Sequence, residues 1–413
     1  MADSIDNNII EEEVVVTATA LPKPKSGTVD QLEGLKPRFL IEINDVLWPS
    51  GAYVTLDVSG FYANSTFAFD YTYSVVANLD EDGKADPNSL LAKILIPNTS
   101  VLRNRVKLYI DYVSDEMDED DLPTKEQLGP PVFFGVIDKI DIDIGDDSVS
   151  ISGRDLTALF QESFTHAQFR NTTTVGALTE ILETYEIKSV IKGKGSPLGS
   201  VYSNERIDFE NLPSGGINNW DLITKFARYD GYKAFFAGDT FYYVPYEDME
   251  EIILFTLYEN IENIKLEKNY SIASSRVTVE IASTRLKEKD STTAKTGPGS
   301  GAGTKGDRAE FRFVIPNVSQ EEAGIIAETM GLTLAQLERV ITIETTGAKQ
   351  QNVQNGLMLQ GTGMEFDLPI YRIIHVNWTL GRGVGWQSEI TAINLPDSGR
   401  LETHRVRQRS SLL

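Results

Sequence analysis

The residue types that most often carry catalysis are scarce in this chain of 413 residues. There are no cysteines, which excludes a thiolate nucleophile, a thiolate metal site and a disulfide. The three histidines, His166, His375 and His404, lie far apart and lack the i, i+4 spacing of a helical metal site. The sequence contains neither a Gly-x-Ser-x-Gly elbow nor a His-Glu-x-x-His motif. We therefore predict no catalytic, cofactor-binding or metal-binding residues, and no enzymatic activity.

Carboxylates are abundant, and two acidic patterns raise the question of cation binding. The spacing of an EF-hand start is found at Asn78, Asp80, Asp82 and Gly83. The twelfth position, however, is Ser89 where a bidentate Glu is needed, so we predict a polar hairpin loop. The acidic run 115–121 predicts a solvated loop, with a calcium cluster as the alternative. With 61 acidic residues, a carboxylate pair for glycoside hydrolysis also stays open.

Phosphate-binding features are weak. Gly303-Thr304-Lys305-Gly306 has the wrong order for a P-loop and no helix is expected after it. The formal charge of −23 argues against a surface that binds nucleic acid tightly. An acidic wall could still line a channel through which DNA passes without binding. His375 lies inside an expected strand, where we interpret it as a packed or surface residue.

The elements around these residues are mostly strands. Residues 133–160 predict two alternating strands around the turn Gly145-Asp146-Asp147, followed by Arg154-Asp155 at the start of a short helix. We expect Asp155 to cap that helix and Arg154 to reach the adjoining domain. The further strands expected before this hairpin are RFLIEIND, AYVTLDVSG, STFAFDYTYSVVA, SLLAKILIP and RVKLYIDYV. Together they predict a closed or nearly closed antiparallel barrel over residues 37–163.

The pattern changes to helical over residues 164–246, where we predict a small α/β domain. Residues 172–174 are possible caps for an amphipathic helix, and the Trp220 helix ends at Gly231. We interpret the apolar face of that second helix as core. A hairpin around Gly238-Asp239 follows.

Residues 247–395 predict a second barrel. Its expected strands are NIENIKLEKNYS, SRVTVEIAST, AEFRFVIP, IYRIIHVNWTLG and WQSEITAINLP. Residues 287–308 have the composition of a flexible loop. Residues 319–342 predict a helical insertion, with an apolar face of Ile325, Ile326, Leu334, Leu337 and Val340.

The two ends differ in charge. Residues 1–36 predict an extended arm that pairs as an edge strand with a neighbour, and they carry no signal peptide. Residues 396–413 form a basic tail with Arg405, Arg407 and Arg409, which suits docking on an acidic partner. No apolar run is long enough to span a bilayer, so no membrane insertion is expected.

Three stretches together resemble the hub proteins of phage tail baseplates, the late control protein D-like family. They are the hairpin with Gly153-Arg154-Asp155-Leu156, the stretch from Trp220 to Phe241, and the ending YRIIHVNWTLGRGVGWQSEITAINLP. The resemblance covers roughly residues 38–395. It implies a mainly β fold with α+β insertions: two tube-like antiparallel β-barrels that superpose, a small α/β domain and a helical insertion.

The resemblance also implies a function without cofactors: a homotrimeric structural hub joining a hexameric tail tube to a trimeric spike and lining part of the DNA conduit. Implied partners are the tail tube or distal tail protein, the spike, the tape measure protein and baseplate wedge proteins. The implied location is the virion tail baseplate, assembled in the bacterial host cytoplasm. The alternatives are the hub of a non-phage contractile injection system and a tail protein that binds or hydrolyses peptidoglycan.

Overall fold

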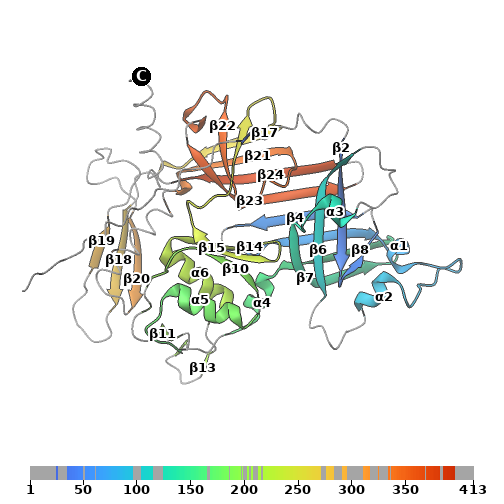
Figure 1. The fold of residues 1–413 in the computed structure, drawn as a ribbon, viewed down its shortest axis with the longest axis horizontal. Helices are drawn as coiled ribbons and strands as arrows, with labels where there is room; N and C mark the ends of the chain where they lie inside the picture. Colours follow the sequence, from blue (N-terminus) through green and yellow to red (C-terminus); the bar gives the residue numbers. More distant parts are fainter. Residues whose placement is uncertain are drawn as a thin grey trace, which may run out of the picture.

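The structure is a computed structural model that shows a mainly β chain (Figure 1). It describes residues 25–26, 35–49, 52–60, 62–95, 104–114, 124–164, 168–185, 187–196, 198, 202–203, 206–207, 213–214, 217–270, 276–282, 291–294, 310–316, 324, 334, 336–367, 369–381 and 385–395.

The first β segment, β2 to β8, is an antiparallel sheet. Its strands are β2 (Leu35–Ile43), β3 (Val46–Leu47), β4 (Tyr53–Ser59), β5 (Thr66–Thr72), β6 (Arg105–Ser114), β7 (Phe133–Asp143) and β8 (Ser148–Asp155). They follow the order β4-β5-β8-β7-β6-β2-β3. The predicted β7–β8 hairpin is confirmed, with Ile140 opposite Ile151. Asp143 Oδ1 accepts hydrogen bonds from the N–H groups of Gly145 and Asp146, which shapes the turn.

Short helices interrupt this segment, and two of them correct strand predictions. They are α1 (Tyr73–Ala77), α2 (Leu90–Leu95) and α3 (Lys125–Leu128). Within the run SLLAKILIP, Leu90–Leu95 form α2 rather than a strand, and the end of STFAFDYTYSVVA forms α1. Ser89 Oγ accepts from the Ala92 N–H at 3.2 Å, which starts the helix, and Leu91 and Ile94 are buried one turn apart. A short apolar run fits a buried strand and a buried helix equally well, so its sequence alone did not discriminate.

The small α/β domain, predicted over residues 164–246, has three helices on a three-stranded sheet, and its first helix lies inside the residues predicted for the first barrel. Its elements are α4 (Thr157–Gln161), α5 (Thr174–Glu183), α6 (Asn219–Asp230) and strands β10 (Lys188–Ile191), β15 (Thr240–Pro245) and β14 (Tyr232–Ala237), in that sheet order. Two small ladders accompany it: β9 (Gln168–Phe169) with β11 (Tyr202–Ser203), and β12 (Arg206–Ile207) with β13 (Pro213–Ser214). The predicted caps are also present. Thr173 Oγ1 accepts from the Gly176 N–H, and Gly231 ends α6 with a φ of 69°.

The second β segment comprises β16, β17 and β21 to β24. These strands are β16 (Ile252–Thr256), β17 (Asn263–Lys268), β21 (Arg339–Thr346), β22 (Gly356–Gln360), β23 (Ile370–Gly381) and β24 (Gly385–Asn394), with 3₁₀ turns η2 (Gln336–Glu338) and η3 (Glu365–Asp367). Most pairings are antiparallel, but β16 pairs with β22 in parallel. From the predicted N-terminal arm, β1 (Lys25–Ser26) pairs in parallel with β16 of its own chain.

Several details of residues 247–395 differ from the prediction. The runs SRVTVEIAST and AEFRFVIP, expected in the second barrel, instead contribute β18 (Arg276–Ala282) and β20 (Glu310–Pro316) to a separate three-stranded sheet. Its third strand, β19 (Ser291–Ala294), lies within the predicted flexible loop 287–308. Residues 339–342, predicted helical, begin β21. Most of the helical insertion, the acidic run 115–121 and the basic tail lie outside the described residues.

The two β segments are one sheet rather than two separate ones. Strand β23 pairs with β24 and β22, and its second half pairs with β4, so fourteen strands form one continuous sheet. One hydrophobic cluster includes Ile41 and Trp48 from the first segment and Trp378 and Trp386 from the second. The side chains of the two segments therefore share one core.

Candidate functional site: the junction of the two β segments and the α/β domain

The β4–β23 pairing joins the two β segments through backbone hydrogen bonds. Its register runs from His375 opposite Ser59 to Leu380 opposite Val54. His375 lies in β23 as predicted, half-buried, with Nε2 2.7 Å from Asp57 Oδ1 of β4. The hydrogen bond to this carboxylate raises the pKa of His375 above its usual value, and Glu389 adds to the shift. An ion pair across the two segments therefore forms as the pH falls.

A second contact joins the segments through side chains. Tyr112 of β6 stacks on Trp386 of β24, with ring centroids 5.4 Å apart, and its hydroxyl donates to the Gly347 carbonyl at 2.9 Å. Lys349 Nζ lies 2.6 Å from Asp111 Oδ2 on β6. The β4–β23 pairing and these contacts between β6 and the second segment hold the two β segments in one orientation.

The three-stranded sheet of the α/β domain has a different partner on each face. Phe236 and Phe241 pack with the helices, whereas Phe235 and Val244 belong to the core shared by the β segments. This alternation follows from the period of two in a strand. The α/β domain is thus packed on the β segments through an apolar sheet face.

A buried cationic cluster lies at the same boundary. Arg372 of β23 is fully buried with its guanidinium carbon 5.3 Å from the Tyr246 ring centroid, and none of its side-chain nitrogens has a hydrogen-bond partner among the described residues. Burial lowers its pKa to about 10. The nearby Lys233 Nζ donates to the Val353 carbonyl at 3.5 Å, and burial followed by repulsion from Arg372 lowers its pKa well below the usual value. No sequence motif indicated this pair, because its members are 139 positions apart in the chain (372 − 233).

The Tyr62 ring links this cluster to the loop between β4 and β5. Its hydroxyl donates to the Tyr232 carbonyl at 2.8 Å and also contacts the Tyr246 hydroxyl. The Arg228 guanidinium lies 5.0 Å from the Tyr62 ring centroid, and Trp220 Nε1 donates to the Tyr62 carbonyl. Aromatic and cationic side chains from all three parts of the fold therefore converge at this joint.

A cavity of about 560 Å³ opens where the three parts meet. Its walls include Asp155 of β8, Phe236 of β14 and Trp378 of β23. Trp378 Nε1 is buried without a hydrogen-bond partner among the described residues. The volume falls in the usual range of ligand pockets, but the structure shows no convergent set of reactive groups there among the described residues.

Asp155 is buried at this cavity, and its carboxylate is occupied by hydrogen bonds. Its oxygens accept from the Ser65 N–H at 3.1 Å, from the Thr157 N–H at 3.0 Å and from the Thr157 hydroxyl. Burial raises its pKa to about 6, and these hydrogen bonds oppose the shift. Asp155 ends β8 and the N-cap residue of α4 is Leu156, so in place of the predicted cap Asp155 accepts only from the Thr157 N–H and hydroxyl at the start of α4. The same carboxylate also holds the β4–β5 loop.

Arg154 pairs with side chains close to its own position in the fold. Its guanidinium binds Asp138 through two nitrogens and reaches Glu162 at 2.8 Å and Gln161. Asp138 lies on β7, and Gln161 and Glu162 lie at the end of α4, which packs with the α/β domain although the sequence analysis placed these residues in the first barrel. The alternation along β8 places residues 153 and 155 on the buried face, so Arg154 points outward to its immediate neighbours.

The other patterns of chemical interest are separate from the junction. In the EF-hand-like loop, Asp80 Oδ1 accepts from the N–H groups of Asp82 and Lys84, so the backbone occupies this carboxylate. No group of His, Cys, Asp and Glu among the described residues could hold a metal ion. A search of the same residues found no helix of sufficient length and apolarity to cross a membrane.

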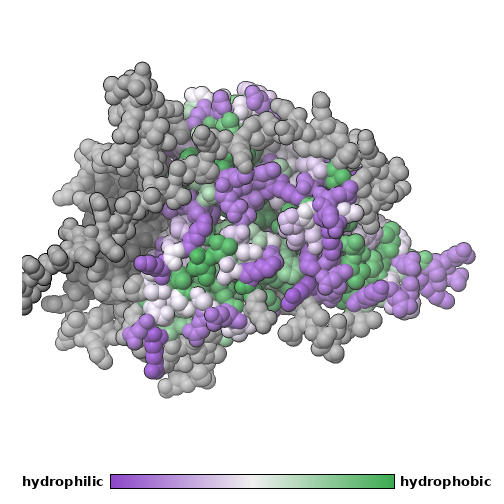
Figure 2. Space-filling view, in the orientation of Figure 1, coloured by the Kyte–Doolittle hydropathy of each residue, from purple (hydrophilic) through white to green (hydrophobic). Residues whose placement is uncertain are grey.

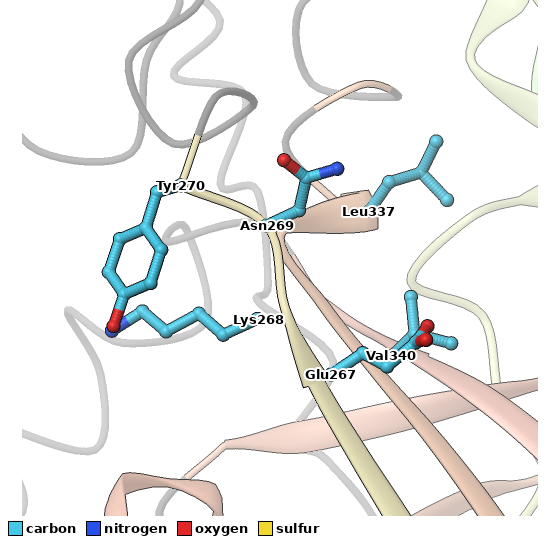
Figure 3. A pocket seen from close by; sticks show the side chains of 6 residues that line it. All are labelled: Glu267, Lys268, Asn269, Tyr270, Leu337 and Val340. Carbon is cyan, nitrogen blue, oxygen red and sulfur yellow. The ribbon is translucent and has the colours of Figure 1, made fainter.

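A second hollow, of about 460 Å³, lies at the end of β17 (Figure 3). Lys268 and Tyr270 extend side by side there, with Lys268 Nζ 5.1 Å from the ring centroid, while Leu337 lies across from them. Lys268 is already paired with Glu365. This hollow contains none of the residues that the sequence analysis singled out except Leu337 and Val340.

Comparisons with known proteins identify the fold. No family model and no curated protein matches the chain. It is similar to the 43 kDa tail protein of prophage MuSo2 from Shewanella oneidensis, with a TM-score of 0.59, 14% identity and coverage of 87% of this chain and 98% of that one. The tail protein from Neisseria meningitidis MC58 gives a TM-score of 0.60 at 13% identity, covering 87% and 97%.

A third similar structure is an E. coli component of the type VI secretion system, itself described as similar to T4 bacteriophage tail proteins gp27 and gp5. It gives a TM-score of 0.51 at 12% identity, covering 86% of this chain and 77% of that one. The chain therefore has the fold of phage tail proteins, as the resemblance in its sequence predicted.

Proposed function

We propose that the chain is a structural hub of a phage tail baseplate: a homotrimer that joins a hexameric tail tube to a trimeric spike and lines part of the DNA conduit. The observation that supports this best is the shared sheet and core of the two β segments. A hub must transmit force between two assemblies without separating into domains, and the β4–β23 pairing suits that role.

The proposed symmetry follows from two barrel-like segments per subunit. Three copies would present six related segments to a hexameric tube and three α/β domains to a trimeric spike. The proposed partners are the tail tube or distal tail protein, the spike, the tape measure protein and the wedge proteins, in the virion tail baseplate. The net charge of −23 suits a wall that passing DNA does not bind.

The oligomeric state and the place in the particle test this proposal. We expect threefold density for this chain on the axis of the assembled tail by electron cryomicroscopy, and superposition of the two β segments within a subunit. A dimer or a hexamer on that axis would contradict the proposal, as would β segments of unrelated topology.

A second candidate is the hub of a contractile injection system that delivers protein, which the similarity to the E. coli type VI secretion component supports. The neighbouring genes discriminate between the two. Capsid and terminase genes beside this one would support the phage hub, and their absence beside sheath and tube genes would support the injection system.

We also propose that the chain has no enzymatic activity and binds DNA weakly. Gel-shift titrations should show retention only at low salt, because the net charge of −23 repels the phosphate backbone. Clearing of purified peptidoglycan that disappears on mutating one acidic residue would contradict this assignment, as would DNA binding that survives high salt.

A further inference from the structure

One end of the first β segment exposes a group of apolar side chains, here called the barrel-end patch. It consists of Val46 on β3, Val75 on α1, Leu95 on α2, and Ile142 and Ile144 on the β7–β8 hairpin. Ile144 is 69% exposed and Val75 57%. Large apolar side chains exposed on connected elements at one end of a sheet are typical of an interaction surface.

Hydrogen bonds hold these elements together, so the patch is preformed. At one side, the Ser74 N–H and hydroxyl donate to the two carboxylate oxygens of Asp147, which ties α1 to the β7–β8 turn. At the other side, Asn104 Nδ2 donates to the Ile94 carbonyl and Asn44 Nδ2 donates to Asn104 Oδ1. This second chain ties α2 to the β2–β3 turn.

Acidic side chains surround the patch. The loop between α1 and α2 exposes Asp80, Glu81 and Asp82 against the single cation Lys84. Asp45 is 83% exposed beside Val46, and Asp141 and Asp143 alternate with the hairpin isoleucines. Figure 2 shows hydrophobic side chains beside hydrophilic ones at the end of the molecule that carries α1 and α2. A fitting partner therefore combines apolar and basic side chains.

The chain has one terminal segment of that chemistry, its own tail, residues 396–413. There Arg405, Arg407 and Arg409 alternate with other residues, among them Val406, and two leucines end the sequence. The body of a second copy is acidic and would be repelled, but its tail would not. We propose that the C-terminal tail of a second copy docks on the barrel-end patch, with its arginines facing the acidic rim.

The position of β24 favours docking between copies. Gly381, paired with Gly385 at the start of β24, lies against the Tyr53 ring at the patch end of the first β segment. Asn394, at the other end of β24, is nine residues farther on, about 30 Å away along the strand. We place the docking between copies because a head-to-tail ring of the proposed homotrimer brings this end of one chain to the patch of the next. This inference rests on the proposed homotrimer.

A labelled peptide of residues 396–413, titrated into the full-length protein and followed by fluorescence anisotropy, tests the docking directly. We expect saturable binding that weakens with salt, and at least about a tenfold loss of affinity in a Val75→Ser/Ile144→Ser double variant. The matched control is Met364→Ser, because Met364 is 59% exposed outside the patch. Equal affinity of the double variant and the control would overturn the proposal.

Crosslinking decides whether the contact is between copies. A photoreactive residue at Val406 of the full-length chain, in a mixture of ¹⁴N- and ¹⁵N-labelled protein, should give mixed-isotope crosslinks to the α1 or β7–β8 peptides. Crosslinks only within a copy, or only outside the patch, would refute the docking. Neither experiment uses the assembled particle, so the two proposals can fail separately. Peptide binding together with an absence of threefold density in the tail would refute the hub assignment and still support the docking.

Discussion

Replacing Asp155 by Ala should destabilise the protein by an amount that depends on pH. The change leaves two buried N–H groups, those of Ser65 and Thr157, without their acceptor. Each unsatisfied buried donor is destabilising by about 1–3 kcal/mol. A second effect of the substitution is stabilising. Burial raises the pKa of Asp155 from 3.8 to about 6, so above pH 6 the charged carboxylate is unfavourable in the folded protein by about 3 kcal/mol, and Asp155→Ala removes that cost.

The sign of the pH dependence follows from linkage. Because the pKa of Asp155 is raised in the folded state, the native protein binds more protons than the unfolded chain between the ordinary aspartate pKa of 3.8 and about 6. The wild type therefore loses stability from this group as the pH rises through that interval. Asp155→Ala removes this dependence, so the difference between wild type and variant should be larger at acidic pH.

Urea unfolding followed by tryptophan fluorescence measures the effect. We expect Asp155→Ala to lower the free energy of unfolding by about 1–3 kcal/mol near pH 7.5 and by about 1 kcal/mol more near pH 5. The matched control is Asp70→Ala, an exposed carboxylate on the adjacent strand β5, with little expected effect. If Asp155→Ala were no worse than the control, or equally destabilising at both pH values, the role assigned to this carboxylate would be wrong.

Three further predictions concern the β sheet and its core. Asp57 raises the folded-state pKa of His375, so the ion pair stabilises the fold below the usual histidine pKa of about 6.5 and this stability is lost as the pH rises through the raised value. His375→Asn should therefore lower the free energy of unfolding more near pH 6 than near pH 8. A loss of stability that grows with pH would contradict this. Gly153→Ala should destabilise by at least about 2 kcal/mol in the same unfolding assay, since its Cβ would lie 2.0 Å from the Val136 carbonyl oxygen, whereas Gly145→Ala meets only a side-chain oxygen at 3.3 Å and serves as control. A chain ending after Tyr246 should lack a cooperative melting transition by circular dichroism, because it loses Trp378 and Trp386 from the shared core; a cooperative melt would show that the first β segment folds alone.

Local features were predictable where a few adjacent residues determine the structure. The alternation of Ile140 and Ile142 with Asp141 and Asp143 predicted β7. Thr173 marked the start of α5 and Gly231 the end of α6. Local energetics also explain the failure at α2. Its apolar run is compatible with two conformations, and the Ser89 cap together with burial of Leu91 and Ile94 decides between them.

Residue patterns were sufficient to predict the fold class, most strands of the first segment, the α/β domain between two β segments, and the acidic character of the chain. Only the three-dimensional structure showed the strand pairings between residues far apart in the chain. These are β23 with β4, and β18 with β20 in a separate sheet. The same holds for the approach of Lys233 to Arg372 and for the apolar patch around Val75 and Ile144. Periodicity reports which face of a strand is apolar, but the partner of that face is chosen by packing and hydrogen bonding among residues far apart in the chain, which no local pattern encodes.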